Sequence, residues 1–364
     1  MPNIEEITAH FRMEGVFISA RLFGSGHIND TYLVNTGPGN SPDYILQRIN
    51  QDIFTNIPEL TNNILKTTHH LRQKLMAAAP EFDRFQIIHL IPSNNGAFYF
   101  HDREGNFWRL YHFIDDSRSY NLFENRTMAY EAGRAFGLFH FLTSDMDPSI
   151  LFVVLPGFHD VSLRLQKFRK TVALDPAGRV ADVQNEIRFV ETRAEKMVAI
   201  QKLGEQRKIP LRVTHNDTKC NNVLFNAANE AIAIVDLDTI MPGYSLYDFG
   251  DAIRTGANTA VEDEADFRKA GIDLELFEAY SRGYLSFAGK FLNPVEIQHL
   301  VFSARFMTYL IGLRFLTDHI DGDHYYKTAF PGHNLQRARV QFNLLESMEE
   351  KAVEMEKIIA GLTG

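Results

Sequence analysis

The residues best suited to chemistry lie between His215 and Asp238. This segment reads HNDTKCNN, a short apolar run, a polar turn, and a second apolar run that ends at Asp236. Two apolar runs that flank a short polar turn are typical of a β-hairpin. Asn222 and Asp236 are equally far along the chain from residue 229, which lies inside the turn. The spacing therefore predicts that the hairpin sets these two side chains opposite each other.

An amide oxygen that faces a carboxylate offers the ligands that Mg²⁺ prefers. Asp217 lies five residues before Asn222, on the loop that leads into the predicted hairpin. A carboxylate there could accept the proton of an attacking hydroxyl while the cation bridges the phosphates of a nucleotide. We therefore predict a phosphoryl-transfer site with Asp217 as the catalytic residue and with Asn222 and Asp236 as metal ligands. Asp238 has the same parity as Asp236, and its part in the metal site stays open.

The early sequence Gly24-Ser25-Gly26 offers a second contact with phosphates. Strand-like runs flank it on both sides and no helix follows, so a dinucleotide-binding Rossmann motif is excluded. Glycines let the backbone approach a ligand closely, and backbone amides can bind phosphate oxygens. We predict that these three residues form a flap over the nucleotide phosphates. Tyr111, at the end of a later strand, is expected near the adenine.

The elements that must position these residues follow from the apolar spacing. Residues 16–49 alternate short apolar runs with turns, which predicts three strands, and residues 57–78 show helical spacing. Strand-like runs return up to residue 114, and most of the later chain is helical apart from the hairpin region. We predict an α+β fold with a small nucleotide-binding sheet lobe, residues 1–112, and a larger helical lobe, residues 113–364, that carries the catalytic and substrate-binding residues.

The order His215-x-Asp217-x4-Asn222, followed by a strand that ends in Asp, resembles the catalytic loop of protein kinases. Asn216 replaces the usual arginine and no APE motif follows, and in these departures the chain resembles the aminoglycoside phosphotransferase and choline kinase superfamily. Within that superfamily it resembles the N-acetylhexosamine 1-kinases. The blocks that carry this resemblance, spread over residues 24–327, are GSGHINDTYLVN, YILQRIN, WRLYHFIDDS, HNDTKCNNVLFN, VDLDTIMPGYSLYDFGDAIRTGAN and RFLTDHIDGDHYYK.

The resemblance implies a protein-kinase-like bilobal fold with an antiparallel sheet in the small lobe. It implies ATP and Mg²⁺ as cofactors and transfer of the γ-phosphate to the anomeric hydroxyl of an N-acetylhexosamine. It also implies that Asp248 supports the catalytic loop, so the letters DFG at residues 248–250 are not the metal motif of protein kinases. For the sugar we expect contacts from His27, Asp217, Arg314 and Tyr325.

One departure from the kinase pattern concerns the third strand, residues 44–49. It contains no lysine to hold the nucleotide phosphates, and either Gln47 or Arg48 could take that place. The missing lysine motivates one alternative, a nucleotide-binding module without catalytic activity. The other alternative keeps the fold and changes the acceptor to another small alcohol, such as an aminoglycoside, choline or a different sugar.

Composition limits the partners. The 364 residues include 37 Lys and Arg against 46 Asp and Glu, a net charge of −9, and no run of four basic residues. We therefore expect no nucleic acid and no membrane as partner. The only cysteine, Cys220, cannot form an internal disulfide, which favours the cytoplasm. The C-terminal stripe could form a dimer seam or pack on its own lobe, so a monomer or weak homodimer is expected; the stripe comprises Leu345, Met348, Ala352, Met355, Ile359 and Leu362.

Overall fold

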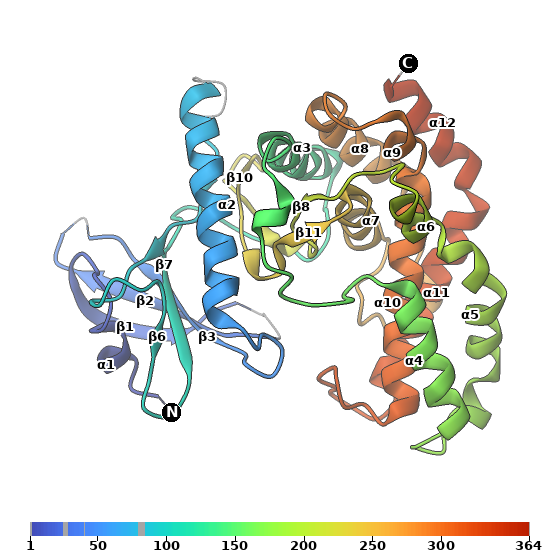
Figure 1. Ribbon diagram of the computed structural model, residues 1–364, viewed down its shortest axis with the longest axis horizontal. Helices are drawn as coiled ribbons and strands as arrows, with labels where there is room; N and C mark the ends of the chain where they lie inside the picture. The colour runs from blue at the N-terminus through green and yellow to red at the C-terminus, as the bar shows by residue number, and fades with distance from the viewer. Residues whose placement is uncertain (1, 25–27, 40, 79–83, 364) are drawn as a thin grey trace.

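An antiparallel sheet forms the N-terminal part of the computed structural model, which describes residues 2–24, 28–39, 41–78 and 84–363 (Figure 1). The short helix α1 (Ile4–Thr8) precedes it. The strand order is β1-β2-β3-β7-β5, and β6 also pairs with β7. The strands are β1 (Val16–Leu22), β2 (Asp30–Gly37), β3 (Tyr44–Ile49), β5 (Leu90–Ile91), β6 (Phe100–His101) and β7 (Phe107–His112). The strands predicted from alternation are confirmed.

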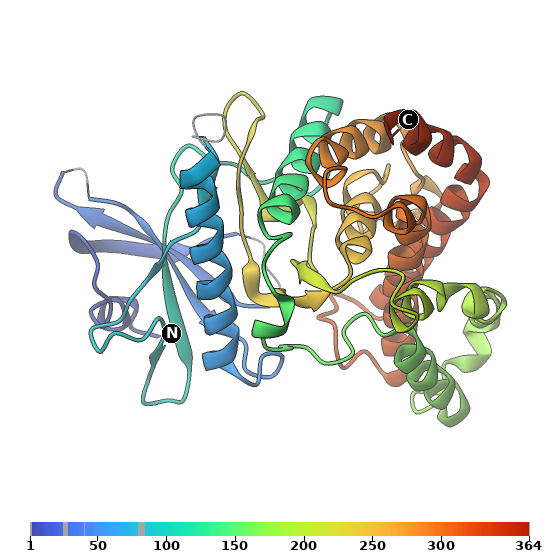
Figure 2. The ribbon, with the colours of Figure 1, turned by 45° about the horizontal axis from the view of Figure 1, so that its top comes forward.

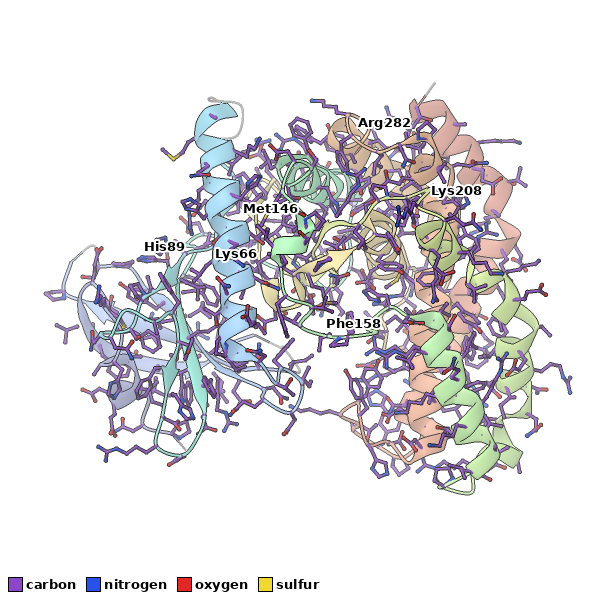
Figure 3. The ribbon with its side chains drawn as sticks, viewed as in Figure 1. Lys66, His89, Met146, Phe158, Lys208 and Arg282 are labelled. Carbon is purple, nitrogen blue, oxygen red and sulfur yellow. The ribbon has the colours of Figure 1, made fainter. Side chains whose placement is uncertain are left out.

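The long helix α2 (Ile57–Ala78) lies between this sheet and the helical part of the molecule in both ribbon views (Figures 1 and 2). Its predicted apolar stripe packs inward: Leu60, Ile64 and Leu71 are at most 4% exposed. Leu65 and Leu75 are partly buried against the same core. Polar contacts also hold it to the later chain. Asn63 Nδ2 donates to the carbonyls of residues 152 and 240, and Lys66, labelled in Figure 3, donates to the carbonyl of Ile150. The helix therefore belongs to the core that both parts share.

A short strand of the early chain also joins the later chain. β4 (Gln86–Ile87) pairs in parallel with β10 (Ala231–Ile234), which pairs in turn with β9 (Val223–Phe225). A separate small core, which includes Phe11, Val34 and Trp108, fills the other side of the N-terminal sheet. The lobe boundary at residue 112 stays a prediction, because the chain before it contributes to both cores.

The rest of the chain is mostly helical, which confirms the predicted α+β fold. The α-helices are α3 (Arg126–Leu142), α4 (Val161–Leu174), α5 (Gln184–Met197), α6 (Ala199–Glu205), α7 (Ser245–Gly256), α8 (Leu274–Ala288), α9 (Pro294–Gln298), α10 (Leu300–Asp321), α11 (His333–Glu350) and α12 (Ala352–Thr363). The 3₁₀ turns are η2 (Pro148–Ile150), η3 (Val180–Val183), η4 (Cys220–Asn222), η5 (Leu237–Thr239) and η6 (Phe267–Lys269), and β8 (Arg212–Thr214) pairs with β11 (Met241–Gly243).

Two features of these helices bear on the sequence analysis. Helix α10 is long and apolar enough to cross a membrane, but 78% of its most apolar window is buried inside the protein. The C-terminal stripe also packs inward, because Leu345, Met348 and Met355 are fully buried and Ile359 is 5% exposed. The stripe therefore packs on its own part of the chain, as one of the two alternatives predicted.

Glycines allow α3 and α8 to pack closely. A Cβ added at Gly133 would lie 2.1 Å from the Tyr280 carbonyl oxygen, which belongs to the backbone of the facing helix. We expect Gly133→Ala to lower the free energy of unfolding by about 1–3 kcal/mol, the usual effect of overpacking. Gly361→Ala is the matched control, because nothing in the described part of the chain lies within 4 Å of its Cβ position in α12. There we expect a gain of up to about 1 kcal/mol from helix propensity. Urea denaturation measures both changes, and equal stabilities would contradict the close packing.

Candidate functional site

The predicted hairpin is present, formed by β9 and β10. Val223 pairs with Ile234, and the Asn222 carbonyl accepts a hydrogen bond of 2.9 Å from the Val235 amide. Asn222 therefore faces Val235, and the predicted register, with Asp236 opposite, is wrong by one residue. The cause is the turn, in which the Asn226 amide donates to the Glu230 carbonyl, so that it is centred one residue earlier than predicted. An irregularity between Ala231 and Ala233 adds one residue to β10 and makes Val235, rather than Ile234, the partner of Asn222. Asp236 follows the strand in a left-handed conformation, with φ 60°.

The catalytic loop, defined as residues 215–222, holds Asp217 between two neighbours. Asn222 Nδ2 donates to the Asp217 carbonyl at 2.8 Å and to its Oδ2 at 3.1 Å. The Lys219 ammonium lies 2.9 Å from Asp217 Oδ1. Burial opposes ionisation of Asp217, but the charge and hydrogen bond of Lys219 prevail and lower its pKa below the ordinary value. Sequence reasoning missed Lys219, although its position two residues after the predicted catalytic aspartate was an available signal.

Asp248 holds the backbone of this loop in place. Its two carboxylate oxygens accept hydrogen bonds of 2.7 Å from the His215 and Asn216 amides, and His140 Nε2 lies 2.9 Å from Oδ2. These bonds fix Asn216 at φ 64°, a conformation that few residues adopt. Residues 248–250 lie inside helix α7, so the letters DFG do not form a metal-binding loop. The geometry matches the supporting role that the resemblance implied for Asp248.

His215 connects the loop to the hairpin. Its Nε2 lies 3.0 Å from the Val235 carbonyl, and its Nδ1 accepts a hydrogen bond of 3.3 Å from the Asp217 amide. Both ring nitrogens are thus used inside the protein. His215 therefore orients the loop and is not placed to act as a base. Asp251, on α7, pairs with Arg254 at 2.8 Å.

The interlobe cleft, a cavity of about 250 Å³, lies between the N-terminal sheet and the hairpin. It brings together five of the predicted site residues, namely Gly24, Gln47, Tyr111, Asn222 and Asp236. Gly24 has φ +77°, which favours glycine, while the predicted Ser25, Gly26 and His27 lie outside the described residues. Much of the remaining lining is apolar, and residues 112–119 contribute part of it.

Gln47 and Arg48 point in different directions. Gln47 lines the interlobe cleft, whereas Arg48 pairs with Asp30 on the adjacent strand and its side chain is 44% exposed. Of the two residues that could replace the expected lysine, the structure therefore places only Gln47 at the cleft. The role predicted for Arg48 in nucleotide binding has no geometric support.

A buried ion pair joins the sheet to the segment after the hairpin. Arg109 on β7 binds both carboxylate oxygens of Asp238, its Nη2 at 2.8 Å from Oδ2, and the two residues are 1% and 3% exposed. Gln47 Oε1 accepts two further bonds from Arg109, at 2.7 and 3.0 Å. Asn29 Nδ2 donates to Asp238 at 2.7 Å. Asp238 is therefore committed to Arg109 and Asn29, and it is not free to join Asp236 as a metal ligand.

Sequence reasoning missed Arg109. It pairs directly with Gln47 across β3 and β7, so a guanidinium on the neighbouring strand stands beside the position of the missing lysine. No short-range pattern connects these residues, which are 62 positions apart. Only the strand register reveals that they meet.

A second, polar cavity of about 340 Å³ lies on the other side of the catalytic loop. Lys219 lines it, and Asn221 lines both this cavity and the interlobe cleft. Asp217, in contact with Lys219, thus stands where the two spaces approach each other. The other residues that line the polar cavity are Asn121, Leu122, Arg254, Thr255, Asn258, Ala260, Val261, Glu262, Asp263, Arg337 and Gln341.

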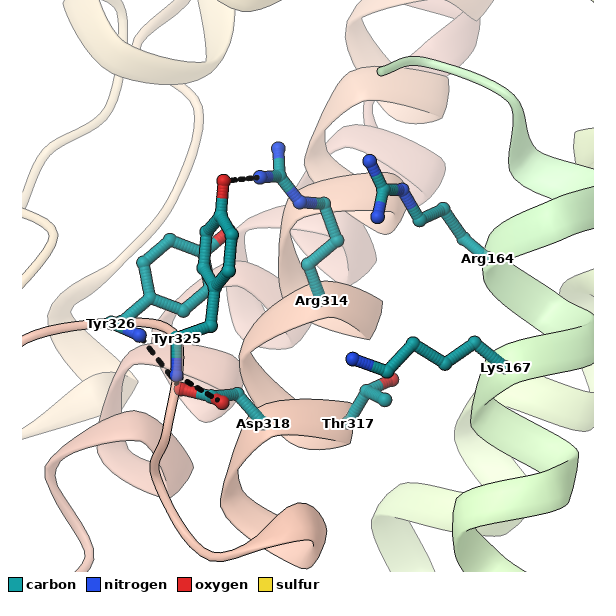
Figure 4. Close-up of a pocket in the computed structure, with 7 residues that line it drawn as sticks. All are labelled: Arg164, Lys167, Arg314, Thr317, Asp318, Tyr325 and Tyr326. Atoms are coloured by element: carbon teal, nitrogen blue, oxygen red, sulfur yellow. Dashed lines mark hydrogen bonds between the residues drawn. The ribbon is translucent and has the colours of Figure 1, made fainter. Parts of the chain in front are cut away.

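The predicted sugar contacts Arg314 and Tyr325 lie together in a different place. They line a small pocket between α4 and α10, which we name the arginine pocket (Figure 4). Its residues are Arg164, Lys167, Arg314, Thr317, Asp318, Tyr325 and Tyr326, and none of them lines the interlobe cleft or the polar cavity. The structure therefore brings Arg314 to Tyr325 but not to Asp217.

The chain is similar to known phosphotransferases along nearly its whole length. The model of the family described as phosphotransferase enzyme family matches residues 19–289. A microcompartment-associated aminopropanol kinase is 16% identical with a TM-score of 0.63, over 97% of this chain and 98% of that one. Choline kinase from Cryptosporidium parvum Iowa II is 14% identical with a TM-score of 0.58, over 99% of this chain and 98% of that one. A spectinomycin phosphotransferase in complex with ADP and spectinomycin is 12% identical with a TM-score of 0.53, over 99% of this chain and 97% of that one. The chain belongs to the phosphotransferase enzyme family.

Proposed function

We propose that the protein transfers the γ-phosphate of ATP to the anomeric hydroxyl of an N-acetylhexosamine. The observation that carries this proposal is the position of Asp217, which Asn222 and Lys219 hold between the interlobe cleft and the polar cavity. The first space suits a nucleotide, because apolar strand residues meet Gln47 and Asp236 there. Two similar solved structures are named as kinases, and the similar spectinomycin phosphotransferase is bound to ADP, which supports the use of ATP.

The chemistry assigned to Asp217 requires an ionised carboxylate, and the lowered pKa of Asp217 is consistent with that state. An ionised carboxylate accepts a hydrogen bond from the acceptor hydroxyl and orients its oxygen toward the γ-phosphate. As the new O–P bond forms and the bond to ADP breaks, the hydroxyl proton passes to Asp217. The Lys219 ammonium, 2.9 Å from the same carboxylate, would stabilise negative charge on the transferred group.

The residues present fit a magnesium ion at Asp236 and Asn222. Within the described residues, nothing donates a hydrogen bond to the Asp236 carboxylate or to Asn222 Oδ1, since the Asn222 amide nitrogen is the atom that binds Asp217. The described chain holds no cluster of three acidic, His or Cys side chains that could bind a metal alone. Two protein ligands with substrate phosphates suit Mg²⁺, which would neutralise phosphate charge there.

The pKa of Asp236 predicts how this binding depends on pH. The Asp236 side chain is exposed to the cleft, but the surrounding protein limits its contact with bulk water. This desolvation, with the charges of Asp238 and Asp217, raises its pKa to about 7. A proton on Asp236 therefore competes with the cation below pH 7. Without a cation, ionisation of Asp236 lowers the stability of the fold as the pH rises toward 7. We expect Mg²⁺-dependent ADP binding, measured by calorimetry, to be weaker at pH 6 than at pH 8. An equal Mg²⁺ requirement at both values would contradict the assignment.

The polar cavity favours a neutral polyhydroxyl acceptor. Its lining contains no aromatic side chain among the described residues, whereas a choline-type cation requires an aromatic cage. Its acidic residues are already neutralised, because Glu262 lies 2.8 Å from Arg254 and Asp263 pairs with Arg337. A polycationic aminoglycoside would need unpaired carboxylates. Amide groups such as Asn258 and Gln341 suit sugar hydroxyls, and the sugar contacts predicted for His27, Arg314 and Tyr325 stay predictions.

ADP release across a panel of acceptors tests the proposal. The panel contains N-acetylglucosamine, N-acetylgalactosamine, galactose, choline and kanamycin, each with ATP and Mg²⁺. We expect release with at least one N-acetylhexosamine and phosphate on its anomeric oxygen. Release of ADP with choline or kanamycin alone would contradict an N-acetylhexosamine acceptor and would indicate a kinase of another small alcohol. ATP binding without release on any acceptor would favour a module without catalytic activity.

A further inference from the structure

The arginine pocket contains positive charge that the protein does not neutralise. Figure 4 shows the guanidinium of Arg164, from α4, beside that of Arg314, from α10, with Lys167 reaching toward Thr317 on the same side. No carboxylate in the described part of the chain forms an ion pair with either arginine. Lys167 is exposed and 3.6 Å from Asp321.

Asp318, the acidic residue in the lining, is occupied elsewhere. Its carboxylate accepts hydrogen bonds from the Tyr325 and Tyr326 amides, at 2.8 and 2.9 Å, and from Asn334 Nδ2 at 2.9 Å. It holds the loop after α10 rather than Arg314, although it lies one turn further along the same helix. Two guanidinium groups are therefore left facing one small space.

Both arginines are arranged in advance of any ligand. Aromatic rings surround the Arg314 guanidinium, with Phe158 at 5.0 Å, Tyr326 at 5.6 Å and Tyr325 at 5.7 Å from its carbon to the ring centres. The Arg164 Nε is buried without a hydrogen-bond partner among the described residues. Burial and the charge of Arg314 lower the pKa of Arg164, as expected for like charges held together. An anion would remove this repulsion and provide the missing acceptor.

We propose that the arginine pocket binds an oxyanion, a phosphate or carboxylate group, through Arg164 and Arg314. The cavity of about 40 Å³ has room for roughly three water-sized groups, which is the scale of such an oxyanion. Guanidinium groups bind these planar or tetrahedral anions with paired hydrogen bonds. The oxyanion is either a free inorganic ion or the phosphate of the sugar phosphate that the proposed reaction forms. The second source rests on the proposed function, and the first does not.

Thermal unfolding with inorganic phosphate tests binding without any need for activity. The titration is made with sodium chloride adjusted to constant ionic strength and with saturating ADP and Mg²⁺ to fill the nucleotide cleft. We expect a saturable rise in the unfolding temperature of the wild type. Arg164→Met and Arg314→Met should each weaken the phosphate dissociation constant by about tenfold or more, as expected for loss of a charge-assisted pair.

The matched control is Arg282→Met. Arg282, labelled in Figure 3, is exposed on α8 and pairs with Glu278, so its loss should leave phosphate binding unchanged. Each pocket variant must keep its stabilisation by ADP with Mg²⁺, which shows that it is folded. A wild type that shows no saturable response to phosphate or sulfate, or pocket variants that respond like the wild type, would overturn the proposal.

The two sources are separated by kinetics with the acceptor found in the panel. Phosphate that binds at Arg314 and competes with the acceptor would place the oxyanion site within the acceptor region. Phosphate that binds there without changing the acceptor KM would identify a free anion as ligand. Both results support an oxyanion site. Neither result depends on which sugar proves to be the acceptor.

Discussion

Replacing Asp217 by Asn is expected to lower kcat by about 10²–10⁴-fold, the usual contribution of a positioned general base. The amide keeps the size of the side chain and can still contact Asn222 and Lys219, so the loop should stay folded. It cannot accept the hydroxyl proton as the new bond forms. Affinity for ADP with Mg²⁺ should remain close to the wild type, because Asp217 does not line the interlobe cleft. Steady-state kinetics and calorimetry measure the two effects separately.

Asp266→Asn is a suitable control for this substitution. Asp266 precedes the turn η6 and pairs with the exposed Arg268, outside all the cavities described above. It should keep full activity. A kcat for Asp217→Asn near that of the control would remove Asp217 from the mechanism, whereas parallel losses of kcat and ADP affinity would show a collapsed loop.

Local spacing was enough to predict much of this site. Asn222 and Asp236 flank a hairpin whose apolar runs and turn are visible in the sequence, and Asp217 lies on the loop before it. In the structure Asn222 contacts Asp217 and lines the interlobe cleft together with Asp236. The register was wrong because the turn is centred between Asn226 and Glu230, one residue earlier than the midpoint that spacing predicted, and the polar letters of the turn do not show this. The alternation of strands and the stripe of α2 were likewise readable, since one buried face imposes a period on each element.

Long-range pairings could not be predicted in this way. The contact of Arg109 with Asp238 depends on the register of β3 with β7 and on how the sheet sits over the hairpin. The place of Arg314 depends on the rotation of α10 about its own axis, because this helix is apolar on most of its surface. Its sequence therefore shows no clear polar face from which the direction of Arg314 could be inferred.

The ion pair of Arg109 with Asp238 predicts the second large effect. Arg109→Met is expected to lower the free energy of unfolding by about 3–5 kcal/mol, because it leaves a carboxylate buried without its partner. Asp238→Asn should lower the free energy of unfolding by a similar amount, because it leaves the Arg109 guanidinium buried without a carboxylate. The new side chain can still accept the hydrogen bond from Asn29. The double variant has no unpaired charge. Its loss should be smaller than the sum of the two single losses, which denaturation of all four proteins measures.

Arg48→Met is the matched control, one residue after Gln47 on the same strand. Its partner Asp30 and its own side chain are both more than one third exposed, so solvent screens the pair and the expected loss is below about 1 kcal/mol. The KM for ATP separates the roles of Arg109 and Arg48 further. Arg109 orders Gln47 in the cleft and, through Asp238, the segment that carries Asp236, so its loss should raise the KM for ATP. If Arg48→Met raised that KM and Arg109→Met did not, the cation that replaces the missing lysine would be Arg48.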